Sequence, residues 1–378
     1  MKTDLIIGLL ETIKADAALI TDPANMRYLT GFTGEGYVLL TSEGAEIVTD
    51  SRYTIAAKKE CPGCKVTQWD KIGIYKPAML LSKDPKIKKI GFEDTYMRVS
   101  AYNTWEKKLR DAKLVPIKDN ATRLRRVKSE EEIETIAEAE AIGDRAFARL
   151  MIDLGVDVDK LGSIGKEVSK YHIPTYIKAT ESTEKQIAAK LEFYMKDEGA
   201  EGLSFETIAA SGLNGAMPHA VPQDKLLEEG ELLTLDFGCV YNGYCSDMTR
   251  TVAVGKVSDE LQKIYNIVKK AQETALKKIH AGITGAEADK LARDVIEKAG
   301  YGDHFGHSLG HSVGLEIHES PGFSRKEKSV IESGMVISVE PGIYVEGVGG
   351  VRIEDLVAVT DTGVRNLAGS VKELIIIE

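Results

Sequence analysis

The sequence predicts an α/β domain over residues 1–122, followed by a longer α+β domain over residues 123–378. Its 378 residues exceed one typical domain, and a hydrophobic content of 43% is sufficient for two cores. The charged stretch Lys118–Lys128 separates two differently patterned parts, which puts the boundary at about 120–128.

Short apolar runs alternate with turn sequences in the first part. The runs AALIT (17–21), YVLLT (37–41), AEIVTD (45–50) and KKIGFED (88–94) predict strands, and 22–36 reads as turns. Helical spacing indicates an amphipathic first helix and further helices over 55–61, around Ala78 and over 100–111. This mixture predicts an α/β domain ending near Pro116.

The second part begins with a helix-start signal. Ser129 followed by Glu132 forms a capping box, which predicts a long helix through about Leu150. Further helices are predicted over 183–197, 258–280 and 286–299, with strand pairs between them.

Charge and composition exclude several classes of function. A net charge of −10 disfavours a nucleic-acid surface, which needs a concentrated basic face. The apolar run Leu5–Leu10 is too short for a signal sequence or a membrane span, so we expect a cytoplasmic protein. Four cysteines do not make a disulfide framework, and the lone CPGC at 61–64 reads as an ordinary turn.

The stretch 302–322, GDHFGHSLGHSVGLEIHESPG, contains four of the seven histidines and five glycines. Histidine titrates near neutral pH and is the commonest metal ligand, and glycine allows the backbone to approach a ligand closely. We therefore expect this stretch at the centre of an active site. An extended segment would put His311 and His318 on opposite sides, which favours separate roles.

Two hairpins supply acidic residues. Asn242-Gly243 is a two-residue turn signal, and that turn would pair Asp236 with Thr249 and bring Asp236 diagonal to Asp247. MVISVEPGIYVEGVGGVRIEDLVAV (335–359) repeats the plan, with Glu340 and Glu354 on its two arms. Carboxylates converging in apolar hairpins repel unless a cation lies between them, so these acids predict a two-metal site.

These residues resemble the ligand set of the pita-bread metallopeptidases, the group of methionine aminopeptidase, aminopeptidase P and prolidase. The resemblance rests on LDFGCVYNGYCSDMTRT (235–251), GHSVGLEIHESP (310–321), VEPGIY (339–344) and GGVRIED (349–355). The first part also resembles the creatinase and prolidase N-terminal domain, in DPANMRYLTGFTG (22–34) and IVTDSRY (47–53). The resemblance therefore implies a creatinase-like N-terminal domain and a pita-bread catalytic domain.

The resemblance also implies a role for each site residue. Asp236 would bind one divalent ion, His311 and Glu340 the other, and Asp247 and Glu354 would bridge both. The ions would activate a water for attack on the scissile carbonyl, with Glu340 as general base. His219 and His318 would contact the substrate and His307 would lie near its proline, while Arg352 either orients a ligand or forms a plain salt bridge.

We therefore expect a homodimeric Xaa-Pro peptidase using two divalent ions, with Mn²⁺ ahead of Co²⁺ and Zn²⁺ because the ligands are mainly carboxylates. Its substrate would be a peptide with proline at the second position. The sequence slightly favours an Xaa-Pro aminopeptidase over the alternative, a prolidase (Xaa-Pro dipeptidase). A metal-free creatinase-like hydrolase or peptide-binding module, and a methionine aminopeptidase, are remoter alternatives. Residues 157–178 look like an insertion, either inert or placed over the cleft or at an interface.

Overall fold

The computed structural model describes residues 2–378, which form two compact units, and the chain passes from one to the other between Arg125 and Arg126. No helix within residues 2–378 is both long and apolar enough to cross a membrane.

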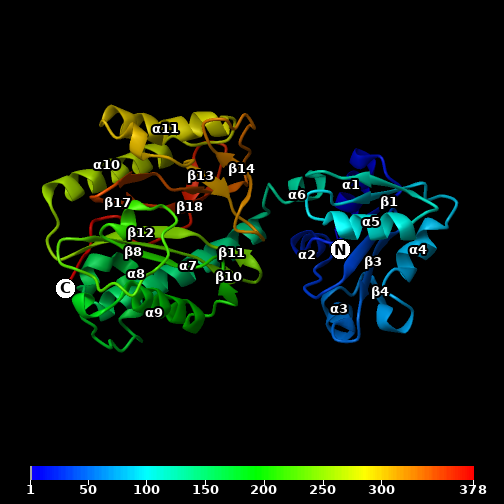
Figure 1. The fold of residues 1–378 in the computed structure, drawn as a ribbon, viewed down its shortest axis with the longest axis horizontal. Helices are drawn as coiled ribbons and strands as arrows, with labels where there is room; N and C mark the ends of the chain where they lie inside the picture. The colour runs from blue at the N-terminus through cyan, green and yellow to red at the C-terminus, as the bar shows by residue number, and fades with distance from the viewer. Residues whose placement is uncertain (1) are drawn as a thin grey trace. The chain divides into compact units, whose positions relative to one another are not determined.

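The first unit is built on a six-stranded mixed sheet in the order β4-β3-β2-β1-β5-β6 (Figure 1). Its strands are β1 (Ala17–Ile20), β2 (Tyr37–Thr41), β3 (Gly44–Thr49), β4 (Lys65–Gln68), β5 (Lys89–Phe92) and β6 (Lys113–Pro116). Its helices are α1 (Thr3–Ile13), α2 (Pro23–Thr30), α3 (Thr54–Glu60), α4 (Lys76–Ser82), α5 (Val99–Lys108) and α6 (Asn120–Arg123). The predicted α/β class is confirmed.

Most predicted elements of this unit are present, but the reading of 22–36 as turns was wrong. Pro23–Thr30 is a helix, because the Asp22 carboxylate accepts a hydrogen bond from the Ala24 amide at 2.9 Å and Pro23 fits the first helical turn. Strands β4 and β6 were missed because both are partly exposed edge strands with little apolar alternation.

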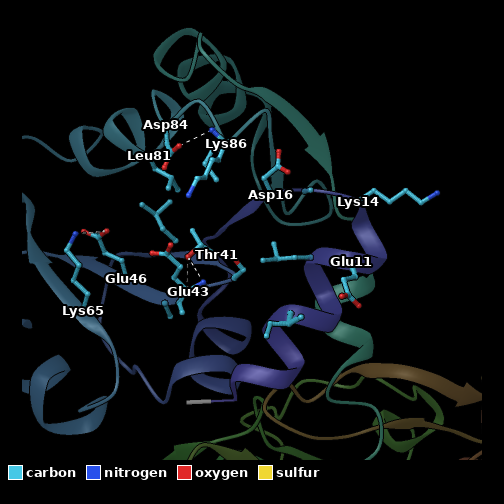
Figure 2. A pocket seen from close by; sticks show the side chains of 18 of the residues that line it. Glu11, Lys14, Asp16, Thr41, Glu43, Glu46, Lys65, Leu81, Asp84 and Lys86 are labelled. Carbon is cyan, nitrogen blue, oxygen red and sulfur yellow. Dashed lines mark hydrogen bonds and ion pairs between the residues drawn. The ribbon is translucent and has the colours of Figure 1, made fainter.

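A surface groove of about 910 Å³ lies in the first unit, lined by residues of both charges (Figure 2). Two of its acids, Asp16 and Glu46, already have partners. Asp16 accepts hydrogen bonds from the backbone amides of Lys88 and Lys89, at 2.8 and 2.9 Å, and Glu46 pairs with Lys65 at 3.1 Å. We assign this groove no ligand.

The second unit contains short sheets between two pairs of helices. Its long helices are α7 (Glu130–Asp153), α9 (Glu184–Asp197), α10 (Asp259–Leu276) and α11 (Gly285–Lys298). Helices α7 and α9 share one apolar core with strands β8, β9 and β12, while α10 and α11 share another with β15, β17 and β18 (Figure 1). The predicted capping box is confirmed, since Ser129 and Glu132 hydrogen-bond each other's backbone amides.

Four sheets run through this unit, in the orders β11-β10-β7, β20-β12-β9-β8, β14-β13-β15-β18-β19 and β16-β17. The strands that frame the site are β8 (Ile208–Ser211), β9 (Leu232–Phe237), β10 (Cys239–Tyr241), β11 (Tyr244–Cys245), β12 (Met248–Val254), β13 (Gly310–Ser312), β14 (Glu319–Phe323), β15 (Val336–Val339), β16 (Gly342–Val345), β17 (Gly349–Arg352) and β18 (Asp355–Val359). The remaining strands are β7 (Gly202–Leu203), β19 (Val364–Asn366) and β20 (Ile376–Ile377).

The first predicted hairpin has the expected register. Asn242 and Gly243 both have positive φ, at 45° and 76°, as a type I′ turn requires. Tyr241 pairs with Tyr244, and Asp236 pairs with Thr249. The ladder is interrupted between β10–β11 and β9–β12, and Asp247 lies in that interruption.

The second hairpin repeats this construction. Val339 pairs with Asp355 in one ladder, and Gly342 pairs with Arg352 in the next. Glu340 and Glu354 lie between the two ladders. Acidic residues therefore stand at the interruption of each hairpin.

Residues 157–178 pack against the second unit's core. They contain the short helices η2 (Val158–Leu161) and α8 (Gly162–Val168), and Val168 is fully buried. His172 is fastened to α7 by a 2.8 Å contact between its Nε2 and Asp153 Oδ1. The residues that line the predicted site include none of this segment, which therefore does not cover it.

Candidate active site

One cavity of about 500 Å³ in the second unit is lined by all eight residues proposed from the sequence as ligands or catalytic groups. These are His219, Asp236, Asp247, His307, His311, His318, Glu340 and Glu354. Their side chains come from separate strands and loops of both hairpins and of the histidine-rich stretch. Residues as far apart in the chain as His219 and Glu354 therefore contribute to one site.

Asp247, His311 and Glu354 form the tightest group in the cavity. One donor atom from each residue lies within 4.8 Å of the others, a spacing that suits a shared metal ion. His311 Nε2 is 3.3 Å from Asp247 Oδ2 and 3.7 Å from Glu340 Oε1. Asp247, Glu340, Glu354 and His311 thus face one another, and Asp236 lines the same cavity.

Unsatisfied oxygens show that these residues fit a cation. Asp236 Oδ1 and Glu354 Oε1 are buried and have no hydrogen-bond partner in the described chain. A buried carboxylate oxygen without a partner is costly, and a divalent ion would satisfy it. The donor set also matches the oxygen-rich sites that hard divalent ions prefer.

The electrostatics of the protein groups alone point the same way. Burial, opposed by Arg352 and reinforced by Asp247, raises the pKa of Asp236 to about 6. Burial raises the pKa of Glu340 to about 7. Burial and then the charge of Asp247 raise the pKa of Glu354 well above its usual range. Positive charge is needed here to keep the carboxylates ionised at neutral pH.

Arg352 forms a buried salt bridge with Asp236, one of the residues that the resemblance implies as a metal ligand. Its Nη2 donates to Asp236 Oδ2 at 2.6 Å, and its Nη1 donates to the Tyr344 hydroxyl at 2.7 Å. Tyr344 lies 3.0 Å from His307 Nε2, while His307 Nδ1 lies 2.8 Å from Ser308 O. Burial lowers the pKa of His307 to about 4, so this imidazole is neutral and its Nε2 can accept a hydrogen bond from the Tyr344 hydroxyl.

The expectation that His311 and His318 lie on opposite sides was wrong. Their ring centroids are 4.5 Å apart, because residues 313–318 form a loop between β13 and β14 instead of an extended strand. Both rings therefore face the same cavity. His219 is exposed at the cavity rim, and His304 contacts Tyr344 O at 3.1 Å without lining the cavity.

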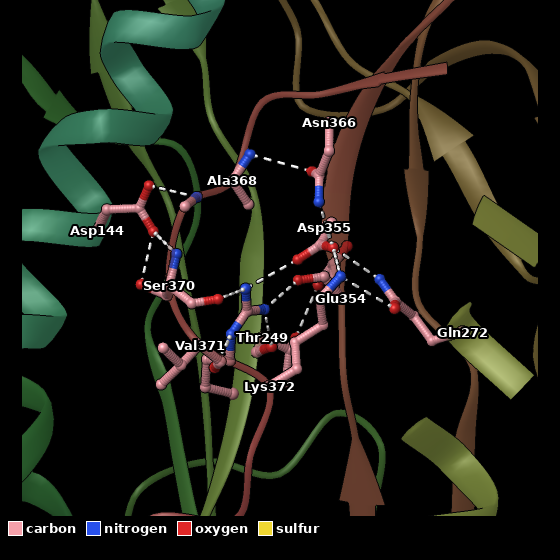
Figure 3. Close-up of polar contacts among 12 residues, drawn as sticks. Asp144, Thr249, Gln272, Glu354, Asp355, Asn366, Ala368, Ser370, Val371 and Lys372 are labelled. Atoms are coloured by element: carbon pink, nitrogen blue, oxygen red, sulfur yellow. Dashed lines mark hydrogen bonds and ion pairs between the residues drawn. The ribbon is translucent and has the colours of Figure 1, made fainter. Parts of the chain in front are cut away.

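Behind Glu354 lies a buried polar network that the sequence did not reveal (Figure 3). Arg250 donates to the Glu354 carbonyl at 2.5 Å and to Asp355 Oδ1 at 2.8 Å. Thr249 donates its hydroxyl proton to Glu354 Oε2 at 2.7 Å. Asp355 also accepts from side chains outside the hairpin, namely Gln272, Asn366 and Lys372. The network fixes the backbone and the carboxylate of Glu354 together.

One signal for this network was present in the sequence. Arg250 stands in the otherwise apolar or hydroxyl-bearing strand MTRTVAV, where a charged residue needs a buried partner. Tyr344 gave no comparable signal, because tyrosine is common in strands.

The comparisons with known proteins agree with this geometry. Residues 134–361 match the model of metallopeptidase family M24. The chain belongs to this family. Residues 4–127 match the creatinase/prolidase N-terminal domain, and the M24 match spans both hairpins and the histidine-rich stretch.

Relatives of this M24 metallopeptidase resemble it over nearly its whole length. It is 36% identical to an Xaa-Pro dipeptidase of Pyrococcus horikoshii, over 99% of this chain and 98% of that protein. Among solved structures, an Xaa-Pro dipeptidase from Bacillus anthracis has a TM-score of 0.90 at 40% identity, covering 100% and 99% of the two chains. An X-Pro aminopeptidase from Thermotoga maritima has a TM-score of 0.86 at 37% identity, covering 98% and 100%.

The enzyme therefore has the predicted creatinase-like and pita-bread domains and belongs to the Xaa-Pro peptidase branch of M24. It is a peptidase that depends on metal, and the carboxylate and histidine group in its cavity is a candidate site for that metal.

Proposed function

We propose that this enzyme is an Xaa-Pro dipeptidase, hydrolysing the bond between a first residue and a following C-terminal proline. The observation that carries the proposal is the single cavity that gathers two aspartates, two glutamates and four histidines. Such a group suits hydrolysis of a peptide bond with metal assistance.

The relatives favour the dipeptidase over the aminopeptidase that the sequence slightly favoured. Xaa-Pro dipeptidases from Pyrococcus horikoshii and Bacillus anthracis align along the whole chain. The aminopeptidase from Thermotoga maritima is also similar over its full length, so the accepted peptide length is what an experiment must decide.

We assign the ligands as the sequence resemblance implies. Asp236 would hold one ion, His311 and Glu340 the other, and Asp247 and Glu354 would be shared. The ions, when bound, polarise the scissile carbonyl and increase the acidity of the attacking water. The short distances among Asp247, His311 and Glu354 support a shared position for the two bridging carboxylates.

The protein's own groups then move protons and orient the substrate. Glu340 takes a proton from the water, and the Ser338 hydroxyl, 3.3 Å from its Oε1, holds that carboxylate in place. His219 and His318 donate hydrogen bonds to the carbonyl oxygen as it gains negative charge. The neutral His307, held by Tyr344, lies beside the proline ring.

Several finer points belong to the same proposal. Mn²⁺ is the proposed ion because carboxylates dominate the ligand set. We also propose a cytoplasmic homodimer. The four free cysteines in the structure suit a reducing compartment.

The test compares two substrates. Purified enzyme with Mn²⁺ is assayed for glycine released from Gly-Pro and from Gly-Pro-Ala. Cleavage of Gly-Pro alone supports the dipeptidase, and efficient cleavage of Gly-Pro-Ala would make the enzyme an aminopeptidase instead.

A variant separates this reaction from a contaminating peptidase. Asp247→Ala removes a ligand that both ions share, so turnover and bound metal should both be lost. Near-normal activity in this variant would contradict the ligand assignment.

A further inference from the structure

A buried ion pair lies outside the proposed catalytic set but next to one of its histidines. Lys128 Nζ is 3.0 Å from Glu319 Oε2, and the two side chains are only 2% and 1% exposed. Lys128 also donates to the Arg126 carbonyl at 3.3 Å, and its own amide donates to Gly334 O at 2.9 Å. Lysine and glutamate side chains are rarely buried to this degree unless they are paired.

Glu319 contacts the loop that precedes it through both its backbone and its side chain. It opens β14, where it pairs with Ser312 of β13, so its backbone is fixed beside His311. Its Oε1 accepts from the Glu316 amide at 3.4 Å. A side chain at Gly314 would meet the carboxylate at 2.7 Å, so glycine leaves the room that this carboxylate occupies.

His318 is the last residue of that loop. The Glu319 carboxylate therefore contacts the 314–318 loop directly beside His318. The His318 ring lies with its centroid 4.5 Å from the centroid of His311, over the candidate metal ligands. Arg126 also donates to the Ser320 hydroxyl at 2.9 Å. Arg126 and Lys128 therefore bind the two residues that directly follow His318.

We propose that Lys128 is a positioning residue that acts through Glu319 to hold the His318 imidazole in the active-site cavity. The role of His318 in turnover rests on the proposed function. The placement of its ring by Lys128 does not, and it can be measured separately.

Removing the Lys128 cation takes a 3.0 Å charge contact away from the buried Glu319 carboxylate. Glu319 would then turn toward water or take up a proton, and the 314–318 loop would no longer be held in one conformation. If the ion pair were purely structural, removing Lys128 would lower only the stability of the fold. A positioning pair should also disturb His318 and reduce kcat more than KM, since His318 acts on the developing charge of the transition state.

The first measurement follows the His318 ring directly. Enzyme labelled with ¹³C at histidine Cε1 is studied by NMR, with the His318 signal assigned from its loss in His318→Ala. Lys128→Met should shift or split that signal. The matched control is Lys190→Met, which breaks a 2.8 Å ion pair with Asp153 that does not line the cavity and should leave the signal unchanged.

The second measurement is a double-mutant cycle on Gly-Pro hydrolysis, with rates divided by the folded fraction. Lys128→Met should lower kcat about 10- to 100-fold, the usual effect of removing a partner that orients a site group. In the His318→Ala background it should lower kcat by less than about two-fold, because the group it positions is already absent. Lys190→Met should leave kcat unchanged.

Glu319→Gln serves if Lys128→Met does not fold, because it keeps the size and the hydrogen-bonding oxygen while removing the charge. It should disturb the same NMR signal with a smaller loss of kcat. An unchanged His318 signal in a folded variant, or an equal loss of kcat with and without His318, would overturn the inference. Wild-type enzyme that does not cleave Gly-Pro would refute the proposed function, and the NMR result would still decide the role of Lys128.

Discussion

Replacing Glu354 by glutamine should change the response to metal and the metal-free stability in opposite directions. The carboxylate is buried, one of its oxygens has no partner, and burial and then Asp247 raise its pKa well above the usual range. A raised pKa means that the metal-free fold loses stability as pH rises above the unfolded value of about 4.3. An uncharged amide removes this loss.

The wild-type response to metal follows from mass action. At a Mn²⁺ concentration 100 times the Kd, one bound ion stabilises the fold by about 2.7 kcal/mol. For a unit of roughly 250 residues this corresponds to a rise in Tm of about 5–10 °C.

The variant lacks a ligand that both ions are proposed to share. If its Kd is about 100-fold higher, the same Mn²⁺ concentration equals the Kd and stabilises by only about 0.4 kcal/mol, or about 1 °C in Tm. Without metal at pH 7, Glu354→Gln should melt at or above the wild-type temperature. This advantage should disappear near pH 4.

Thermal unfolding with EDTA and with increasing Mn²⁺ measures both effects. Glu140→Gln is the matched control, because Glu140 is also a fully buried carboxyl whose two oxygens lack hydrogen bonds in the described chain. That control lies outside the proposed ligand set and should keep the full metal response. A full metal response in Glu354→Gln, or a marked loss of metal-free stability, would refute the reasoning.

Three further substitutions test other parts of the structure. Burial pushes the pKa of Asp153 upward, but hydrogen bonds from Lys190 and other donors outweigh it and lower that pKa. The stability from a lowered pKa is present above about pH 4 and is lost below it. Asp153→Asn should therefore lower the free energy of unfolding by about 3 kcal/mol at pH 7, as measured by urea unfolding. If the difference between wild type and variant were the same at pH 3, this reasoning would be contradicted. His219→Ala should lower kcat about 100-fold and keep its bound metal by elemental analysis, whereas metal loss would mean that His219 is a ligand. Gly310→Ala should lose both stability and bound metal, since its Cβ would overlap the Ser338 carbonyl, and a Tm like that of the wild type would show that the strands can separate there.

The first hairpin could be predicted because one local signal fixes its register. A type I′ turn at Asn242-Gly243 determines every pair that follows, including Asp236 with Thr249. The position of Asp247 near the cavity then follows from strand geometry alone. The ligands themselves were recognised through the resemblance.

The arrangement around His318 could not be predicted in the same way. Its position depends on a loop between β13 and β14 and on Lys128, which is 190 residues earlier in the chain. Pattern within one segment contains no information about such a partner. The helix over 23–30 was missed for a different reason, because its N-cap residue and its proline were interpreted as turn signals.

The interruption of each hairpin at its acidic residues has a consequence for the order of folding. Asp236 and Asp247 belong to one hairpin, and Glu340 and Glu354 to another about 100 residues later, so neither hairpin alone forms the complete site. Contacts so distant in sequence form late, after the loop-closure entropy of the intervening chain has been lost. A metal that binds only the assembled pair would then slow unfolding while leaving the rate of folding nearly unchanged. The ions would thus protect the enzyme mainly by prolonging the lifetime of the native state.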